Sequence, residues 1–363
     1  MTGATDPAAA GDAGDAHPSV QVARDLADRV LAPQAAQVDR AGIPPSHIAA
    51  IKASGLLGMG APVEVGGTAA PPPVIRLVSE ILAAADATTW FVQVQHHSPL
   101  ATAVRGEGAA RQRLLRPLAD GTLLAGVAFS QLRSYPRVQV AATPVDGGWQ
   151  FDGTAPWCTG WGLNDVLMLA GTTPDAEVVF CFIDAREQPG LRASAPMRLA
   201  ALEASRTVRL HLDGLRVGAD AMIHRTTMAD WSAADRRTTV NVNPAVFGIA
   251  GAALDLLERA ATEDATRLAG VLRSRLQTAR RDAYALLDGV PAEERLADRL
   301  AARLEAMDVM QTATSAAVIA GGGRAMAATA PAQRLAREAM FLLVQAQTAD
   351  LRGAQLRHLA DQS

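Results

Sequence analysis

The spacing of apolar residues changes twice along this chain, and no other feature constrains its fold as strongly. Before about residue 121 the apolar residues recur every three to four positions, as at Val20, Ala23 and Leu26, which predicts helices. Between residues 124 and 223 short β-type runs are separated by turn sequences, and after about residue 228 the helical spacing returns. Helices, then strands, then helices predict an α+β fold, and not the alternating order of a Rossmann or TIM-barrel fold.

We expect this pattern to divide the chain into four segments. Residues 1–17 are mostly Ala, Gly, Asp and Pro, and they lack the basic start and apolar middle of a signal peptide. They predict a disordered cytoplasmic tail. We expect an N-terminal helical domain at 18–123, a middle antiparallel β-barrel or sandwich domain at 124–225, and a C-terminal helical bundle at 226–363.

The composition argues against several classes of protein. A formal net charge of −3 lacks the basic footprint of a nucleic-acid binder, so we expect no nucleic-acid partner. No uncharged apolar run reaches the length of a membrane span, so we expect no membrane partner. The two cysteines, Cys158 and Cys181, do not have the spacing of metal ligands, which predicts no metal site and a reducing cytoplasm.

Three strings in the chain resemble those of one known family. Gly126–Ser130 reads GVAFS, Trp149–Thr173 reads WQFDGTAPWCTGWGLNDVLMLAGTT, and Gly321–Ala339 reads GGGRAMAATAPAQRLAREA. With the order of helices and strands, they resemble the acyl-CoA dehydrogenase family over nearly the whole chain after the tail. The resemblance implies FAD bound between a β domain and a C-terminal helical bundle. It also implies a homodimer or homotetramer in which a neighbouring subunit completes the FAD site.

The first candidate cofactor-binding residues lie in the middle domain. Trp157 and Thr159 are two residues apart on a predicted strand and are therefore expected on one face. The resemblance implies that Trp157 lies against the flavin and that Thr159 bonds near its N5. It also implies that Phe129 and Ser130 form the wall beside the flavin pyrimidine ring. The alternatives are a core Trp beside a turn Thr, and an ordinary strand end.

Further candidates lie in the C-terminal part. Gly322 and Gly323 match a glycine pair that lets the backbone approach a neighbour's FAD, because glycine has no Cβ. A helix kink or interhelical packing is the alternative. Thr348 and Asp350 match positions that contact the ribityl and adenosine parts of FAD. Arg133 or Arg137 could bind a phosphate where the family's phosphate-binding Gly-Ser pair is missing, or both could be surface arginines.

The family's catalytic glutamate has no counterpart in this chain. Ala346 stands at one of the two positions where members carry it, and Thr238 stands at the other. Neither side chain can act as a strong general base. Asp235 and Asp350 are near in sequence but are displaced by a helical position or more. The sequence therefore assigns no catalytic residue.

A histidine pair adds a second possibility. Flavin monooxygenases with this fold often carry a His in the helix that contains His96 and His97, near the reacting part of the flavin. Such a His can relay a proton because its pKa lies near neutrality. The alternative is a capped or buried structural histidine before Ser98-Pro99.

These observations leave three functional hypotheses. The first is an FAD-dependent acyl-CoA dehydrogenase-like oxidoreductase acting on the CH–CH group of an acyl thioester or a related small molecule. The second is a flavin-dependent monooxygenase on the same fold, which explains the missing glutamate and the histidine pair. The third is a catalytically degenerate subunit that completes the FAD site of a partner.

Overall fold

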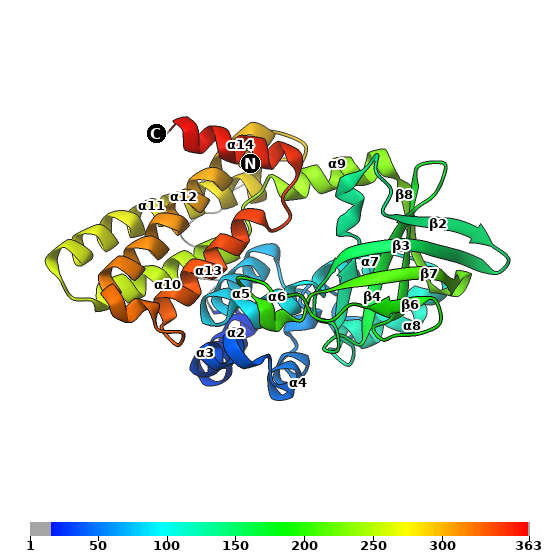
Figure 1. The fold of residues 1–363 in the computed structure, drawn as a ribbon, viewed down its shortest axis with the longest axis horizontal. Coiled ribbons are helices and arrows are strands. Elements are labelled where there is room, and N and C mark those ends of the chain that lie inside the picture. Colours follow the sequence, from blue (N-terminus) through cyan, green and yellow to red (C-terminus); the bar gives the residue numbers. More distant parts are fainter. Residues whose placement is uncertain (1–15, 362–363) are drawn as a thin grey trace, which may run out of the picture. The chain divides into compact units, whose positions relative to one another are not determined.

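The computed structural model of the protein describes residues 16–361, so most of the predicted tail, residues 1–15, lies outside the described residues. The chain packs as two compact units. The first comprises Met1–Arg198 with Glu203–Met228, and the second comprises Leu199–Leu202 with Ala229–Ser363. The predicted order of helices, sheet and helices is confirmed (Figure 1). The domain boundaries stay a prediction.

The first unit begins with helices. They are α2 (Pro18–Leu26), a π-helical turn (Ala27–Leu31), α3 (Ala32–Ala41), α4 (Pro45–Ala53), α5 (Pro72–Ala85), α6 (Ala87–Val94), α7 (His97–Arg105) and α8 (Gly108–Ala119). Prolines begin α4 and α5, at a position where the missing N–H has no helical partner to lose. The helix expected to contain both His96 and His97 is interrupted at Gln95 and His96, so His97 begins a new helix.

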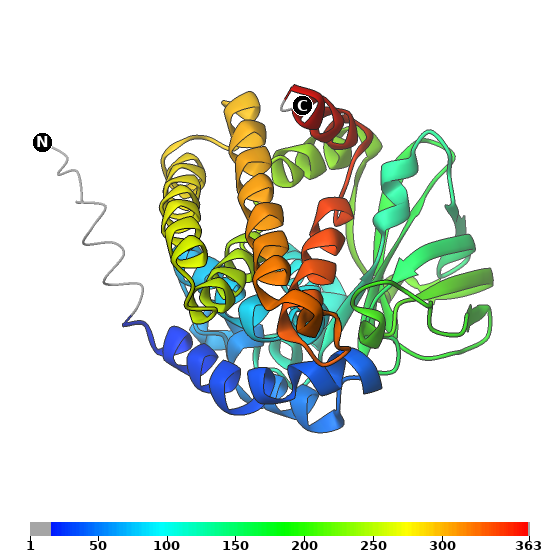
Figure 2. The ribbon, with the colours of Figure 1, turned by 60° about the vertical axis from the view of Figure 1, so that its left-hand side comes forward.

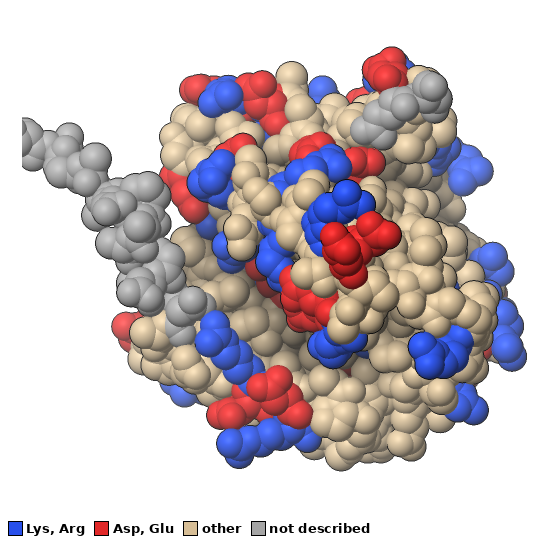
Figure 3. All heavy atoms as spheres, turned by 90° about the vertical axis from the view of Figure 1, so that its left-hand side faces the viewer, with Lys and Arg blue, Asp and Glu red and all other residues tan. Residues whose placement is uncertain are grey.

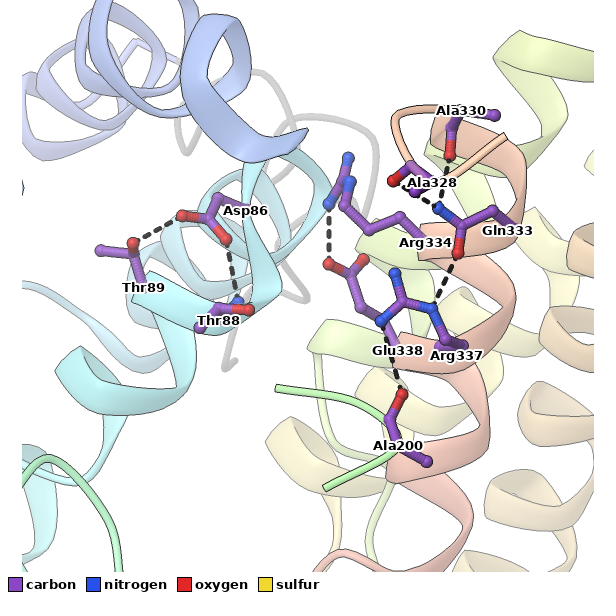
Figure 4. Close-up of polar contacts among 10 residues, drawn as sticks. All are labelled: Asp86, Thr88, Thr89, Ala200, Ala328, Ala330, Gln333, Arg334, Arg337 and Glu338. Atoms are coloured by element: carbon purple, nitrogen blue, oxygen red, sulfur yellow. Dashed lines mark hydrogen bonds and ion pairs between the residues drawn. The ribbon is translucent and has the colours of Figure 1, made fainter. Parts of the chain in front are cut away.

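Asp86 fixes the start of α6. Its carboxylate accepts hydrogen bonds from the backbone N–H of Thr88 at 3.0 Å and from Oγ1 of Thr89 at 2.5 Å (Figure 4). These bonds satisfy donors that the first helical turn leaves without partners.

The second part of the first unit is an eight-stranded sheet. Its strands are β1 (Ala125–Ala128), β2 (Val140–Val145), β3 (Gly148–Cys158), β4 (Val166–Thr172), β5 (Glu177–Asp184), β6 (Leu191–Ala193), β7 (Val208–Gly218) and β8 (Met222–Thr227). The strand order is β6-β7-β3-β2-β4-β5-β8, with β1 beside β4. The end strands β6 and β8 do not pair with each other among the described residues, so the sandwich-like alternative is confirmed rather than a closed barrel.

The sheet differs from the prediction in strand direction. β1 and β2 each pair with β4 in parallel, while the remaining pairs are antiparallel, so the sheet is mixed. β4 is buried at every residue. A strand buried on both faces is a continuous apolar run, and such a run gives no alternation from which direction could be inferred.

The sheet has an apolar core of its own. Phe151 of β3, Leu167 of β4 and Cys181 of β5 are fully buried in it. α7 contacts β1, and α8 contacts β8. The contact with α7 supports β1, which leads to the predicted flavin-binding residues Phe129 and Ser130.

The second unit is a helical bundle. Its helices are α9 (Met228–Thr239), α10 (Ala245–Arg259), α11 (Glu263–Gly289), α12 (Leu296–Gly321), α13 (Pro331–Val344) and α14 (Ala349–Asp361), with a 3-10 turn at Gly322–Met326. Figure 2 shows α10 to α13 as neighbouring ribbons from yellow to orange-red. Within α13, Nη1 of Arg334 lies 2.7 Å from Oε1 of Glu338, a buried ion pair one turn apart (Figure 4).

The surface of the bundle carries both signs of charge. On the face drawn in Figure 3, basic and acidic side chains are interspersed rather than separated by sign. Arg275 of α11, for example, lies 2.9 Å from carboxylate oxygens of both Glu305 and Asp308 of α12. Within residues 16–361, no helix combines the length and the apolar character needed to cross a membrane.

Candidate functional site

The turn after β3 is built around a buried asparagine. Nδ2 of Asn164 donates to the carbonyl of Thr159 at 2.8 Å, and Gly160 N–H donates to the carbonyl of Ser205 at 2.8 Å. Gly160 has a φ of +80°, and a Cβ there would lie 2.6 Å from Nδ2 of Asn164. The position therefore requires glycine for its backbone conformation and for space.

Trp157 and Thr159 differ in exposure at this turn. Trp157 is 51% exposed, whereas Thr159 is buried. The β3–β7 register shifts between Ala155 and Cys158, which is a bulge, and β3 ends at Cys158. Simple strand alternation therefore does not extend across both residues. The structure leaves the aromatic ring available to a ligand.

The hydroxyl of Thr159 already has a protein partner. Its Oγ1 lies 3.1 Å from Oγ1 of Thr207, which lies 3.2 Å from Oγ of Ser205. A hydroxyl can donate one bond and accept two, so Thr159 keeps capacity for a further bond. The neighbouring residue Cys158 lies between Trp157 and Thr159 in the sequence. Burial raises the pKa of its thiol to about 12, so this thiol stays protonated.

The end of β1 holds a hydroxyl without a partner. Oγ of Ser130 is buried and has no hydrogen-bond partner among the described residues. Phe129 is half-buried and packs edge-on against Phe180, with ring centroids 5.7 Å apart. The 3-10 turn that begins at Ser130 contacts β3. A buried hydroxyl without a partner costs free energy, which a bound polar group would recover.

Gln131 holds this turn against the sheet, and no sequence pattern singles it out. Its Nε2 donates to the carbonyl of Ala128 at 3.3 Å and to the carbonyl of Ala170 at 2.8 Å. Its side chain is almost fully buried, and its Oε1 has no partner among the described residues. Gln131 therefore fixes Ser130 relative to β1 and β4.

The two predicted histidines have different environments. His96 is fully buried, its Nδ1 accepts from Ala125 N–H at 3.0 Å, and its Nε2 lies 3.1 Å from the carbonyl of Leu118. Both ring nitrogens are thus used in joining helices to β1. Burial is the main cause that lowers the pKa of His96 to about 3, so the ring is neutral at pH 7. His96 is a structural histidine.

His97 keeps one ring nitrogen available. Nε2 of His97 lies 2.9 Å from Nε2 of Gln93, which is an amide nitrogen and can only donate. The proton of the neutral ring is therefore on Nδ1, for which no partner exists among the described residues. His97 is partly exposed, and desolvation lowers its pKa to about 4. The ring is a neutral hydrogen-bond donor at pH 7.

The candidates in the second unit lie at helix ends. Gly322 follows α12 and has a φ of +56°, a conformation that favours glycine, and both Gly322 and Gly323 are exposed. Oγ1 of Thr348 accepts from Leu351 N–H at 3.2 Å and so caps α14. The proposed cofactor contacts of these residues stay predictions.

The structure joins the neighbours of Thr238 and Ala346, the two residues predicted to stand at the family's glutamate positions, through one side chain. The guanidinium of Arg303 donates to the carbonyl of Thr239, next to Thr238, and to the carbonyl of Gln345 at 3.4 Å, next to Ala346. Segments about a hundred residues apart therefore meet at one side chain. Thr238 uses its hydroxyl to bond the carbonyl of Ala234 at 3.1 Å.

Sequence reasoning missed the buried arginines of α12. Arg299 and Arg303 are one turn apart, and Ala306 and Met310 continue the same buried face. The signal in the sequence that could have revealed them is the position of these arginines on the apolar face of the helix.

Comparison with known proteins identifies the class to which this fold belongs. Butyryl-CoA dehydrogenase from Megasphaera elsdenii superimposes with a TM-score of 0.80 over 99% of this chain and 100% of its own, at 19% identity. The dibenzothiophene monooxygenase of Paenibacillus sp. A11-2, whose structure is also known with FMN bound, gives 0.78 over 96% of this chain and 98% of its own, at 20% identity. The chain has the fold of the acyl-CoA dehydrogenases.

Sequence comparison confirms the predicted resemblance. Residues 17–122 match the family described as acyl-CoA dehydrogenase, N-terminal domain. A probable acyl-CoA dehydrogenase of Mycobacterium leprae is 28% identical over 246 residues, or 64% of this chain and 62% of that protein. A dibenzothiophene monooxygenase of Rhodococcus erythropolis is 35% identical over 170 residues, or 45% of this chain and 40% of that protein. The chain thus spans at most about three fifths of these two relatives.

Proposed function

We propose that this chain is an FAD-dependent oxidoreductase of the acyl-CoA dehydrogenase type, acting on the CH–CH group of an acyl thioester. The observation that carries the proposal is the buried Ser130 hydroxyl without a protein partner, beside Phe129 and on a turn that contacts β3. β3 leads to the exposed ring of Trp157. An exposed aromatic plane and an unused polar group on neighbouring elements fit a flat heterocycle with polar edges.

The residues proposed to hold the flavin have separate roles. Trp157 provides a surface for ring stacking, Phe129 provides an apolar wall, and Ser130 and Thr159 provide hydroxyl groups. When bound, the flavin supplies the acceptor for a hydride from the substrate's β-carbon. Gln131 keeps Ser130 in place, because it bonds two carbonyls of the sheet. Gly322 and Gly323 are proposed to contact the FAD of a neighbouring subunit, and Thr348 is proposed to contact the ribityl or adenosine part of FAD.

A second candidate function is supported by His97. This ring presents a neutral N–H without a protein partner, and a monooxygenase needs a donor near the reacting oxygen. Thr238 and Ala346 also supply no base for removing an α-proton. The monooxygenase relatives make this candidate a direct competitor, and a subunit without activity of its own is the third.

The proposed partners follow the proposed reaction. The substrate is a small acyl thioester or a related compound, and the protein is a cytoplasmic homodimer or homotetramer. Exposed apolar residues of the second unit, among them Ile319 and Met326, support association with another copy.

Three measurements separate these functions. Titration of the purified chain with FAD and with FMN should give a spectral shift with FAD at lower concentration. Bleaching of the bound flavin by a panel of acyl-CoA compounds would support dehydrogenation. Oxygen consumption with supplied reduced flavin and a hydroxylated product would support monooxygenation. Absence of any flavin uptake would overturn both enzyme proposals for the isolated chain.

A further inference from the structure

Two arginines of α12 are buried in the second unit. Arg299 is 2% exposed and Arg303 is 4% exposed. A buried guanidinium is tolerated only when its N–H groups are hydrogen-bonded. Arg299 donates to neutral oxygens, and their distances are 3.0 Å to the Glu294 carbonyl, 2.9 Å to Oδ1 of Asn241, 2.8 Å to the Val290 carbonyl and 3.0 Å to the Pro291 carbonyl. Its positive charge is thus surrounded by backbone carbonyls of the segment before α12 and by the side chain of Asn241.

Arg303 joins the end of α9 to the turn after α13. Nη1 donates to the carbonyl of Thr239 and, at 3.3 Å, to that of Asn241, while Nη2 donates to the carbonyl of Gln345 at 3.4 Å. Nδ2 of Asn243 also donates to Oε1 of Gln345 at 3.1 Å. α9 ends at Thr239, and α13 ends one residue before Gln345. Carbonyls at helix C-termini carry partial negative charge, which matches a cation.

We propose that Arg303 is a positioning residue for the reaction site. It holds the end of α9 and the turn after α13 together, and with Arg299 it makes the surroundings of Ala346 electropositive. This inference rests on the proposed function, because the resemblance to the acyl-CoA dehydrogenases places the base that removes the substrate's α-proton at residue 346 or 238. On that function, the site favours a substrate that carries or develops negative charge beside Ala346.

The absence of a carboxylate at residue 346 agrees with this electrostatic role. A carboxylate beside guanidinium groups has a lowered pKa and is a weak base. The charged residues in the first turn of the adjoining α14 are Asp350 and Arg352, and Nε of Arg352 donates to Oε1 of Gln347 at 3.1 Å. Asp350 is exposed, so solvent screens it more than it screens the buried arginines.

The test uses a thiol introduced by Ala346→Cys. The native Cys158 and Cys181 are fully buried, and burial raises the pKa of each to about 12, so neither reacts in the folded protein. The rate of alkylation by iodoacetamide against pH then reports the pKa of the introduced thiol alone. We expect a value at least about one unit below the ordinary 8.5 of a free thiol.

Paired variants separate charge from packing. Arg303→Gln removes the charge but keeps a hydrogen-bond donor, and it should raise the pKa of the thiol by about one unit. Arg303→Lys keeps the charge and should leave the pKa low. Arg295→Met is the matched control, because Arg295 is an exposed arginine just before α12. It should leave the pKa unchanged.

The outcomes that overturn the proposal are distinct. A thiol pKa at or above about 8.5 in the Ala346→Cys protein rejects the electropositive site, whether or not the arginine variants fold. Equal shifts in Arg303→Gln and Arg295→Met reject the specific role of Arg303. No flavin is needed for these measurements, so FAD titration separately decides the proposed function.

Discussion

Nδ1 of His96 accepts a hydrogen bond from the backbone N–H of Ala125 at 3.0 Å, so a fully buried imidazole fixes the first residue of β1. The same ring lies 3.1 Å from the carbonyl of Leu118 in α8. Three elements therefore meet at one neutral side chain. Because β1 leads directly to Phe129 and Ser130, the His96 ring contributes to the candidate site through the backbone and not through contact with a ligand.

This role predicts a pH-dependent stability. The pKa of His96 is lowered to about 3 by burial, whereas that of an unfolded His is 6.5. Below pH 6.5 the unfolded state binds more protons, so stability is lost as pH falls and is fully present above that pH. At pH 5 the loss from this residue is about 2 kcal/mol. Urea unfolding of wild type and His96→Gln at pH 7 and pH 5 measures it.

The variant should be less stable than wild type at pH 7 by about 1–3 kcal/mol, because buried backbone groups lose a partner. Between pH 7 and pH 5 it should lose less stability than wild type. Other histidines with lowered pKa values, such as His97, remain in both proteins, so only the difference between them is diagnostic. Equal losses would contradict a neutral buried His96.

Trp157→Ala should weaken flavin binding with little effect on folding. About half of the residue is exposed, so its removal leaves little cavity in the free protein. Loss of its contact area with a planar ligand should cost about 2 kcal/mol, or about 30-fold in dissociation constant. Fluorescence titration with FAD and thermal unfolding of the same samples give the two quantities.

Trp149→Ala is the control for this experiment, because Trp149 lies near the other end of β3 and is half-buried. Trp149→Ala should lower the thermal stability of the protein and should change the dissociation constant for FAD less than Trp157→Ala does. If Trp157→Ala bound FAD as wild type does, the ring would not be part of the flavin site.

Wild type should dehydrogenate simple straight-chain acyl-CoA compounds poorly even when it holds flavin. Ala346 and Thr238 provide no base, and a positioned base contributes about 10²–10⁴-fold in rate. Ala346→Glu should raise the rate of flavin bleaching by butyryl-CoA. Ala346 already has a Cβ and a φ of +54°, so replacing it with glutamate adds little backbone strain. The electropositive surroundings of residue 346 should lower the pKa of the introduced carboxylate and make it a weaker base. The gain in rate should therefore stay below the full range of about 10²–10⁴-fold.

Two results would reject this prediction. The first is rapid bleaching of wild type by butyryl- or octanoyl-CoA. The second is loss of that activity in Asp350→Asn, which would make the exposed Asp350 the base.

Association should depend on exposed apolar residues of the second unit. Ile319 is 79% exposed and Met326 is 72% exposed, at and after the end of α12. We expect a homodimer or homotetramer, and Ile319→Asp should shift it towards monomer because a charge would be buried in the interface. Light scattering at micromolar concentration measures the mass. Val63→Asp, at a 65% exposed residue of the first unit, should leave the mass unchanged.

The sequence determined the order of elements and the general location of the flavin-binding candidates. Before residue 121 and after residue 228, apolar residues recur at helical spacing because each helix buries one face. The structure confirms helices in both regions. The missing base at Ala346 is also a property of the sequence alone. β6 was not predicted because three residues carry almost no pattern.

Only the tertiary structure decided which polar groups have partners. His96 and His97 are adjacent in sequence, yet backbone groups bond both nitrogens of the His96 ring, while the N–H of His97 has no partner within residues 16–361. Arg303 connects Thr239 with Gln345, which no local pattern relates. The physical reason is that hydrogen bonding and desolvation depend on residues distant in sequence. Periodicity reports only which face of an element is buried, and not what it is buried against.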